Sequence, residues 1–227
     1  MTLGHSLTLS GAALIALPSG GLFWPDEGLL CVSDLHLGRS ERMARRAGAL
    51  LPPYDSAATL ARLDADIEAV RPARVICLGD SFDDLAAAEA MDEADRLWLL
   101  RLMAGRDWLW IEGNHDPGPI DIGGAHLESL RVGPLSFRHI AEPDGGAEVS
   151  GHFHPKARIA GLSRPCFVTD GSRLVLPAYG SYTGGLDCTT PALRDLFGKG
   201  ARVILTGPRP IVAPLDQISP RSSSLSR

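Results

Sequence analysis

Short apolar segments rich in Val, Ile and Leu, separated by helical patterns and turn signals, constrain the fold of this chain most. Three of them have the length of buried strands and are the clearest strand candidates: residues 29–32, 74–78 and 108–111. Between the first two, apolar residues at helical spacing predict a helix that Asp55 can cap and that Pro72 ends. A second helix is predicted over 92–103. This alternation predicts an α/β or α+β sheet protein.

The second half of the chain is richer in strands and in Gly and Pro turns. Short strands are predicted at residues 135–137, 148–150, 167–169, 174–176 and 203–205. Neither an internal repeat nor a long linker divides the sequence. We therefore expect a single domain over residues 1–213 and a disordered C-terminal tail over residues 214–227, which ends in a Ser-rich stretch.

Composition excludes several classes of protein. The chain has 227 residues, is 44% hydrophobic and 22% charged, and carries a net charge of −5. These values are typical of a soluble globular protein and exclude disorder, collagen and coiled coil. The acidic balance argues against coating nucleic acid by charge alone, although a local basic patch or a bound metal can still hold a phosphate.

The N-terminal region and the cysteines indicate a cytoplasmic protein without a membrane partner. The apolar run at 12–17 is much shorter than the ~20 residues that cross a bilayer. It follows no Lys or Arg and is broken by Pro18, so a secretory signal fits poorly. The cysteines show no Cys-x-x-Cys spacing and are expected to be buried free thiols: Cys31, Cys77, Cys166 and Cys188.

Each of the three clearest strands ends in a polar cluster, and a fourth cluster follows Val149. The clusters contain Asp34 and His36, then Asp80, then Asn114, His115 and Asp116, and finally His152 and His154. Carboxyl ends of adjacent parallel strands meet in one crevice, so these groups can lie together. Glycine precedes Asp80, Asn114 and His152, which permits a sharp turn or a close approach of backbone.

The chemistry of these side chains indicates a catalytic metal site. Carboxylate, imidazole and amide groups without a thiolate favour Mn, Fe or Zn in an open site over a Cys-rich structural zinc site. The candidates are too many for one tetrahedral ion and suit two ions that share a carboxylate, about 3.5–4 Å apart. Two such cations would outweigh the charges of Asp34 and Asp80 and attract phosphate.

The ordered motifs resemble those of the calcineurin-like metallophosphoesterases. The matching elements are Asp34-x-His36, Gly79-Asp80, Gly113-Asn114-His115-Asp116, His139 and Gly151-His152-x-His154. The resemblance implies a four-layer α/β (α+β) sandwich of two mixed β-sheets flanked by helices. It implies one ion on Asp34, His36 and His154, and another on Asn114, His139 and His152, with Asp80 bridging. His126 is a less suitable rival for His139.

The same resemblance implies the catalytic roles. A hydroxide between two divalent ions, Mn²⁺ first and Fe or Zn as alternatives, would attack phosphorus in line. His115 would protonate the leaving oxygen, Asp116 would orient the imidazole of His115, and Asn114 would also touch the substrate phosphate. Asp83, three residues after the bridging position, can orient a ligand, and a solvated loop carboxylate is the alternative.

Two groups of residues keep alternative interpretations. Arg39, Arg42 and Arg46 share a face if helical and can either clamp further phosphates of a polymeric substrate or form a solvated basic face. Tyr179 and Tyr182 can stack on a base or pack in the sheet or a hairpin, and packing is favoured.

Longer segments resemble one group within the family, the bacterial DNA ligase-associated metallophosphoesterases. They are the opening at 34–38, the connection at 50–55 and the segment at 177–180. This resemblance implies a DNA phosphodiesterase or endonuclease with DNA as substrate, associated in repair with an ATP-dependent ligase and a helicase. A small-molecule phosphatase or nucleotide-conjugate pyrophosphatase of the same fold is the alternative. A non-catalytic scaffold is disfavoured by the intact His115 and ligand set.

Overall fold

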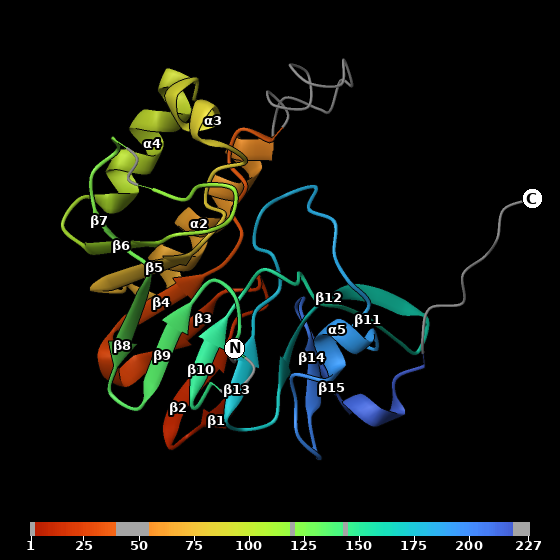
Figure 1. Cartoon of the computed structure of the whole chain (residues 1–227). Helices are drawn as coiled ribbons and strands as arrows, with labels where there is room; N and C mark the ends of the chain where they lie inside the picture. Colours follow the sequence, from red (N-terminus) through yellow and green to blue (C-terminus); the bar gives the residue numbers. More distant parts are fainter. Residues whose placement is uncertain (1–2, 40–54, 119–120, 143–144, 220–227) are drawn as a thin grey trace, which may run out of the picture.

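Two β-sheets packed face to face form the centre of the protein (Figure 1). The computed structural model describes residues 3–39, 55–118, 121–142 and 145–219. Helices α2 (Asp55–Val70), α3 (Leu85–Glu89) and α4 (Glu93–Met103) cover the outer face of the first sheet. Helix α5 (Pro191–Arg194) covers part of the outer face of the second. The molecule therefore has four layers, and the predicted sandwich of two mixed sheets flanked by helices is confirmed.

The first sheet has seven strands in sequence order. They are β1 (His5–Leu9), β2 (Ala12–Ala16), β3 (Leu22–Trp24), β4 (Leu29–Val32), β5 (Arg74–Leu78), β6 (Asp107–Ile111) and β7 (Ala125–Leu127). Strands β1 to β4 pair antiparallel, whereas β4 to β7 are parallel. The helices α2 to α4 lie in the crossovers between β4, β5 and β6, so the carboxyl ends of these three strands lie at one edge.

The second sheet has the strand order β15-β14-β12-β13-β10-β9-β8, with β11 paired to β12. Its strands are β8 (Ser129–Val132), β9 (Leu135–Arg138), β10 (Glu148–Ser150), β11 (Lys156–Ile159), β12 (Leu162–Thr169), β13 (Arg173–Val175), β14 (Arg202–Leu205) and β15 (Ile211–Pro214). Strand β10 is parallel to both β9 and β13. Strands β9 and β10 therefore also end at a common edge.

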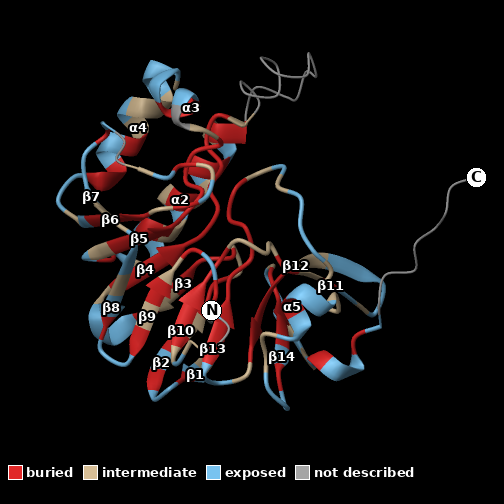
Figure 2. Cartoon of the chain, viewed as in Figure 1, coloured by how far each residue is buried: buried red, intermediate tan, exposed pale blue. Residues whose placement is uncertain are grey.

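Strand β4 shows how the sequence produces these layers. Leu29 and Cys31 belong to the core between the two sheets, whereas Leu30 and Val32 face the helices. A strand buried on both faces has a continuous apolar sequence, as residues 29–32 do. Figure 2 shows buried residues along the strands of both sheets and exposed residues on the outer sides of the helices.

The helices follow their sequence signals. Helix α2 buries Leu60, Leu63 and Ile67 on one face and ends before Pro72. Helix α4 begins after Asp92, whose side chain accepts a hydrogen bond from the backbone N–H of Ala94. None of the described helices is long and apolar enough to span a bilayer. All four cysteines are free and buried, as predicted.

The prediction that the disordered tail begins at residue 214 is wrong. Pro214 ends β15, and a short 3₁₀ helix follows at Leu215–Gln217. Leu215 and Ile218 are buried in the apolar cluster on the outer face of the second sheet, which explains why this segment is ordered. Residues 220–227 lie outside the described residues.

Candidate metal centre

The predicted metal ligands meet where strand ends of the two sheets face each other. The segments after β4, β5 and β6 carry Asp34, His36, Asp80 and Asn114, and those after β9 and β10 carry His139, His152 and His154. Backbone hydrogen bonds join neighbouring segments within each sheet. The N–H of Asp34 donates to the carbonyl of Gly79 (3.2 Å), and the N–H of Gly151 donates to that of His139 (2.9 Å).

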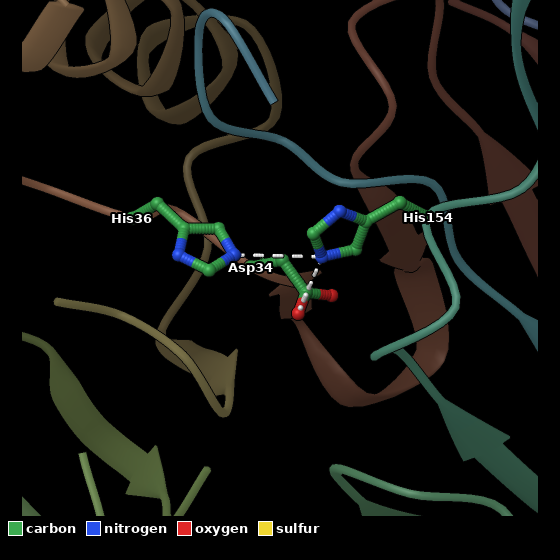
Figure 3. A group of neighbouring side chains, drawn as sticks. All are labelled: Asp34, His36 and His154. Carbon is green, nitrogen blue, oxygen red and sulfur yellow. Dashed lines mark hydrogen bonds and ion pairs between the residues drawn. The ribbon is translucent and has the colours of Figure 1, made fainter. Parts of the chain in front are cut away.

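One group of ligands combines Asp34, His36 and His154. A ligand atom from each lies within 4.8 Å of the other two. The Nε2 atoms of His36 and His154 are 3.4 Å apart, and Nε2 of His154 lies 3.0 Å from Oδ1 of Asp34. Figure 3 shows both imidazole rings turned toward the carboxylate between them. The arrangement is the three-residue set expected for the first ion.

A second group combines Asp80, His139 and His152, again with ligand atoms within 4.8 Å of one another. Nε2 of His139 lies 3.4 Å from Oδ2 of Asp80 and 3.3 Å from Nδ1 of His152. The amide Oδ1 of Asn114 is 3.1 Å from the same Nε2. The structure thus brings together all seven predicted ligands in two adjacent groups, each drawn from both sheets.

Neighbouring groups fix the orientation of two of these imidazoles. Nδ1 of His36 lies 2.9 Å from Oδ1 of Asp83, and Nδ1 of His139 donates to the carbonyl of Leu78 at 3.0 Å. A histidine that is hydrogen-bonded through Nδ1–H presents the lone pair of Nε2 to its ligand. In both cases Nε2 faces the ligand group, and Asp83 contacts His36 as the predicted orienting role requires.

The Asp34 carboxylate has one oxygen fixed by the protein and one left for a cation. Its Oδ2 accepts hydrogen bonds from Ser33 Oγ (2.5 Å) and from the backbone N–H of His152 (3.0 Å). Its Oδ1 is buried, accepts no well-formed hydrogen bond and faces Nε2 of His154. A buried carboxylate oxygen needs a positive partner. This oxygen, together with the O and N donors around it, fits a divalent metal.

The two buried carboxylates are ionised. Burial raises the pKa of Asp34, but His154, His139 and Ser33 outweigh it and hold the pKa below its usual value. Burial also opposes ionisation of Asp80, yet His139 and the N–H of His115 lower its pKa to about 2. Conversely, burial lowers the pKa of His139, but Asp80 and Asp34 raise it to about 9. The pocket therefore favours positive charge, as a cation site must.

The backbone of the site is strained. Five of the seven ligands have positive φ angles: Asp34 (53°), His36 (46°), Asp80 (45°), His152 (68°) and His154 (47°). This conformation costs a residue other than glycine on the order of 1 kcal/mol or more. Within the described residues, nine side-chain-bearing positions have positive φ, so most of this strain lies at the site. Such strain concentrates where function requires a particular geometry.

Glycines allow the strand ends to approach each other, as the sequence predicted. A Cβ on Gly79 would clash with the imidazole of His139, and one on Gly151 would clash with Ser33 Oγ. A Cβ on Gly113 would clash with the backbone N of Asp80. These three positions therefore tolerate no side chain without displacing a ligand.

His115 lies beside the first ligand group. Its backbone N–H donates to Oδ1 of Asp80 (2.8 Å), and its Nδ1 donates to the carbonyl of Asp83 (2.9 Å). Its ring centroid is 5.2 Å from that of His36 in an edge-to-face arrangement. The imidazole is thus held next to the ligands, with its Nδ1 fixed by a main-chain oxygen.

The expectation that Asp116 orients the imidazole of His115 is wrong. The Asp116 carboxylate accepts hydrogen bonds from the backbone N–H groups of Asp80 (3.0 Å), Ser81 (2.7 Å), Phe82 (3.1 Å) and Gly113 (3.1 Å). Burial, with a contribution from the charge of Asp80, raises the pKa of Asp116 to about 6, although these N–H groups lower it. Asp116 therefore ties together the two loops that carry Asp80 and Asn114.

The other candidate residues have mixed outcomes. Arg39 lies beside the site, with Nη1 3.4 Å from Oδ1 of Asp83. Arg42 and Arg46 lie outside the described residues. Tyr179 is fully buried, as predicted for a ring that packs in the core. Tyr182 is 56% exposed, so the prediction that its ring packs in the sheet or a hairpin is wrong.

Two groups that hold ligands in place, a hydroxyl and a main-chain carbonyl, could not be recognised from motifs in the sequence. Ser33, which fixes Asp34, and the carbonyl of Leu78, which fixes His139, were not singled out. Ser33 had one available signal, since it is a polar residue at the end of a buried apolar strand. A backbone carbonyl has no sequence signal.

The profile of the calcineurin-like phosphoesterase family matches residues 29–199. The chain therefore belongs to this family, and it is a metal-dependent phosphoesterase with a candidate dinuclear site. Among solved structures, it is similar to the crystal structure of the Pseudomonas putida nuclease MPE, with a TM-score of 0.72 and 29% identity over 91% of this chain and 99% of that one. No curated protein matches the sequence. The family resemblance drawn from the motifs is confirmed.

Proposed function

We propose that this protein hydrolyses phosphodiester bonds in DNA with two divalent ions, of which Mn²⁺ is the preferred one. The observation that carries the proposal is the pair of adjacent ligand groups, each built from strand ends of both sheets. Similarity to a structure described as a nuclease supports a diester substrate. Asp34, His36 and His154 would hold one ion, and Asn114, His139 and His152 the other. Asp80 would bridge them.

The surrounding side chains complete the chemistry. When bound, two divalent ions activate water as a nucleophile near neutral pH and stabilise charge on the phosphate. His115 donates Nδ1–H to the carbonyl of Asp83, so Nε2 is the nitrogen that carries the transferable proton. As an imidazolium, His115 protonates the leaving oxygen. Asn114 is exposed, so its amide can also contact the substrate phosphate.

We further propose a role in DNA repair together with an ATP-dependent ligase and a helicase. The motif resemblance to the ligase-associated group supports this role. Co-purification of the protein with either partner from cells, or genes for both beside its own, would agree with it. Absence of both a physical and a genetic association would contradict it.

A substrate panel tests the proposed activity. Protein loaded with Mn²⁺, Zn²⁺ or Mg²⁺ is assayed on bis-p-nitrophenyl phosphate, single-stranded DNA and p-nitrophenyl phosphate. We expect Mn²⁺-dependent cleavage of the diester and of DNA. Turnover of the monoester or of a nucleotide conjugate, with no cleavage of either diester, would replace the nuclease by a small-molecule phosphatase or pyrophosphatase.

A further inference from the structure

A basic cavity of about 510 Å³ lies beside the metal centre and has no role in the chemistry described above. Its wall includes the side chains of Arg62, Lys156, Arg164 and Tyr182, and we call it the basic cavity. Arg62 comes from α2, Lys156 from β11 and Arg164 from β12, while Tyr182 lies in the segment that follows β13. Chain segments remote in sequence thus place three cations around one hollow.

The basic cavity adjoins the first ligand group. Gly180 lines the cavity, and its backbone N–H donates to the carbonyl of Asp34 at 3.0 Å. Lys156 is two residues beyond His154 in the chain. The cavity wall is therefore continuous with the backbone of two metal ligands, and a chain bound at the metal centre can extend into it.

Each cation of the cavity donates a hydrogen bond to a main-chain carbonyl. Arg62 donates to the carbonyl of Tyr179, Nζ of Lys156 to that of Thr183 at 3.0 Å, and Nη1 of Arg164 to that of Thr206 at 3.2 Å. No Asp or Glu is among the described residues that line the cavity, although Asp66 interacts with Arg62 from one helical turn away. The described residues that line the cavity therefore include three cations and no acid.

Tyr182 adds an aromatic surface. Its side chain is 56% exposed, and its φ is 58°, a conformation that is unfavourable for an aromatic residue. A strained, exposed ring beside cations has no packing role to justify it. Aromatic rings in such positions are stacking platforms for the bases of single strands.

A second cavity, on the other side of the metal centre, has the opposite charge. It has a volume of about 380 Å³ and includes Asn114 and His139 in its wall. Three acids also line it, Glu112, Glu128 and Glu142, together with the single arginine Arg138. A polyanion held at the metal centre is repelled on this side and attracted on the side of the basic cavity.

We propose that the basic cavity binds the segment of single-stranded DNA next to the scissile phosphate. A neighbouring phosphate lies on Arg164 and Lys156, and the adjoining base stacks on Tyr182. The contrast between the two cavities directs the strand out of the centre past the Asp34 and His154 side. This inference rests on the proposed function, because it assumes a DNA strand at the metal centre.

Binding of a fluorescently labelled single-stranded oligonucleotide, measured by anisotropy, tests the cavity without catalysis. Tyr182→Asn accepts the same backbone conformation and should weaken binding roughly tenfold. Tyr182→Phe should bind like the wild type, because it keeps the ring. Arg164→Gln should weaken binding. Because it removes one phosphate contact, it should also reduce the slope of log Kd against the logarithm of the salt concentration by about 0.7. The matched control is Arg131→Gln, an exposed arginine on β8 at the far edge of the same sheet.

The outcomes separate this inference from the proposed function. Three results would overturn the inference. The first is that Tyr182→Asn and Arg164→Gln bind as tightly as the wild type, and the second is that Arg131→Gln weakens binding as much as they do. The third is that the wild type does not bind the oligonucleotide. In activity assays, Arg164→Gln should lose several-fold more kcat/KM on the oligonucleotide than on bis-p-nitrophenyl phosphate. The wild type could also bind the oligonucleotide through these residues and cleave no DNA. That result would refute the proposed function but would support the cavity as a binding site for single-stranded DNA. Thermal unfolding checks that each variant is folded.

Discussion

At the scale of single residues, the metal ligands are positioned by partners on neighbouring strand ends. Ser33 holds Asp34, Asp83 holds His36, and the carbonyl of Leu78 holds His139. Groups that fix a ligand's orientation in advance reduce the reorganisation needed for metal binding. Changing such a partner should therefore affect metal affinity while every ligand remains.

Asp83→Ala tests this positioning. Loss of the carboxylate frees Nδ1 of His36, and we expect metal affinity to fall about 10–100-fold. Titration of the metal-free protein with Mn²⁺ by calorimetry measures the change. Asp84→Asn is the control, because it removes the adjacent charge but keeps an oxygen for the N–H of Ala87 at the start of α3. Unchanged affinity in Asp83→Ala would refute the orienting role.

His115→Ala tests the proposed general acid. The variant keeps all seven ligands, so it should retain its metal while kcat falls roughly 10²–10⁴-fold. Metal content and turnover of bis-p-nitrophenyl phosphate are measured on the same sample. His126→Ala, which removes a histidine stacked on Trp110 in the first sheet, should keep its turnover. Loss of metal with unchanged activity per bound ion would show that His115 is a ligand instead.

The ligands could be predicted from the sequence because their residue types and their positions after strands both carry information. Asp34 and Asp80 follow continuous apolar runs, and parallel strands must end together. The role of Asp116 could not be predicted in this way. Whether its carboxylate contacts an imidazole or backbone N–H groups depends on how two loops fold. The residues next to Asp116 in the sequence do not indicate which of the two occurs.

At the scale of elements, strand β10 matters most, because two ligands follow it. Its first residue, Glu148, pairs with Arg173 of β13, with Oε1 and Nε 2.7 Å apart and both side chains buried. Burial raises the pKa of Glu148, although Arg173 and Arg138 lower it. Arg173 also donates to the carbonyls of Leu196 and Glu142. The pair fixes the middle of the second sheet.

Arg173→Met should therefore destabilise the protein strongly. It leaves the buried Glu148 carboxylate without its main partner, and removing one member of a buried pair costs about 3–5 kcal/mol. The double variant Arg173→Met/Glu148→Leu should recover a large part of this loss, because no buried charge remains. Urea denaturation measures both free energies of unfolding. A double variant as unstable as the single one would show that the pair itself is not the cause.

Helix α2 is tied to the rest of the molecule through Asp66, which makes its docking pH-dependent. Asp66 accepts hydrogen bonds from Ser19 Oγ (2.5 Å) and from the Tyr179 hydroxyl (2.8 Å). Burial raises its pKa above the ordinary 3.8, although Ser19, Tyr179 and Arg62 lower it. The contribution of this group to stability is therefore complete below about pH 4 and is lost as the pH rises through the raised value.

Asp66→Asn removes this titration. The free energy of unfolding of the wild type, relative to that of the variant, should fall as the pH rises above about 4. Urea denaturation of both proteins at several pH values provides the comparison. A difference that stays constant over the range, or one that grows with pH, would contradict the assigned direction.

The central strands and both longer helices could be predicted because apolar runs and helical periodicity are strong signals. Strands β4 and β5 have the predicted bounds, and α2 ends before Pro72 as expected. The hairpin of β1 and β2, the edge strands β8 and β15, and the pairing of β11 were not predicted. Their residues alternate in burial or lie at sheet edges, where pairing with a neighbour decides the structure.

At the scale of the whole molecule, the metal centre is a product of the two-sheet architecture. The first sheet supplies Asp34, His36, Asp80 and Asn114, and the second supplies His139, His152 and His154. The core between the sheets, which contains Ile76, Phe137 and Val149, keeps these two sets at a fixed separation. Neither sheet alone completes a ligand group, so the fold and the site depend on each other.

Anomalous diffraction from a crystal grown with excess Mn²⁺ tests the dinuclear centre most directly. Two peaks should appear, one among Asp34, His36 and His154 and the other among Asp80, His139 and His152, at about 3.5–4 Å from each other. A single peak, a peak away from these residues, or none at all would contradict the account.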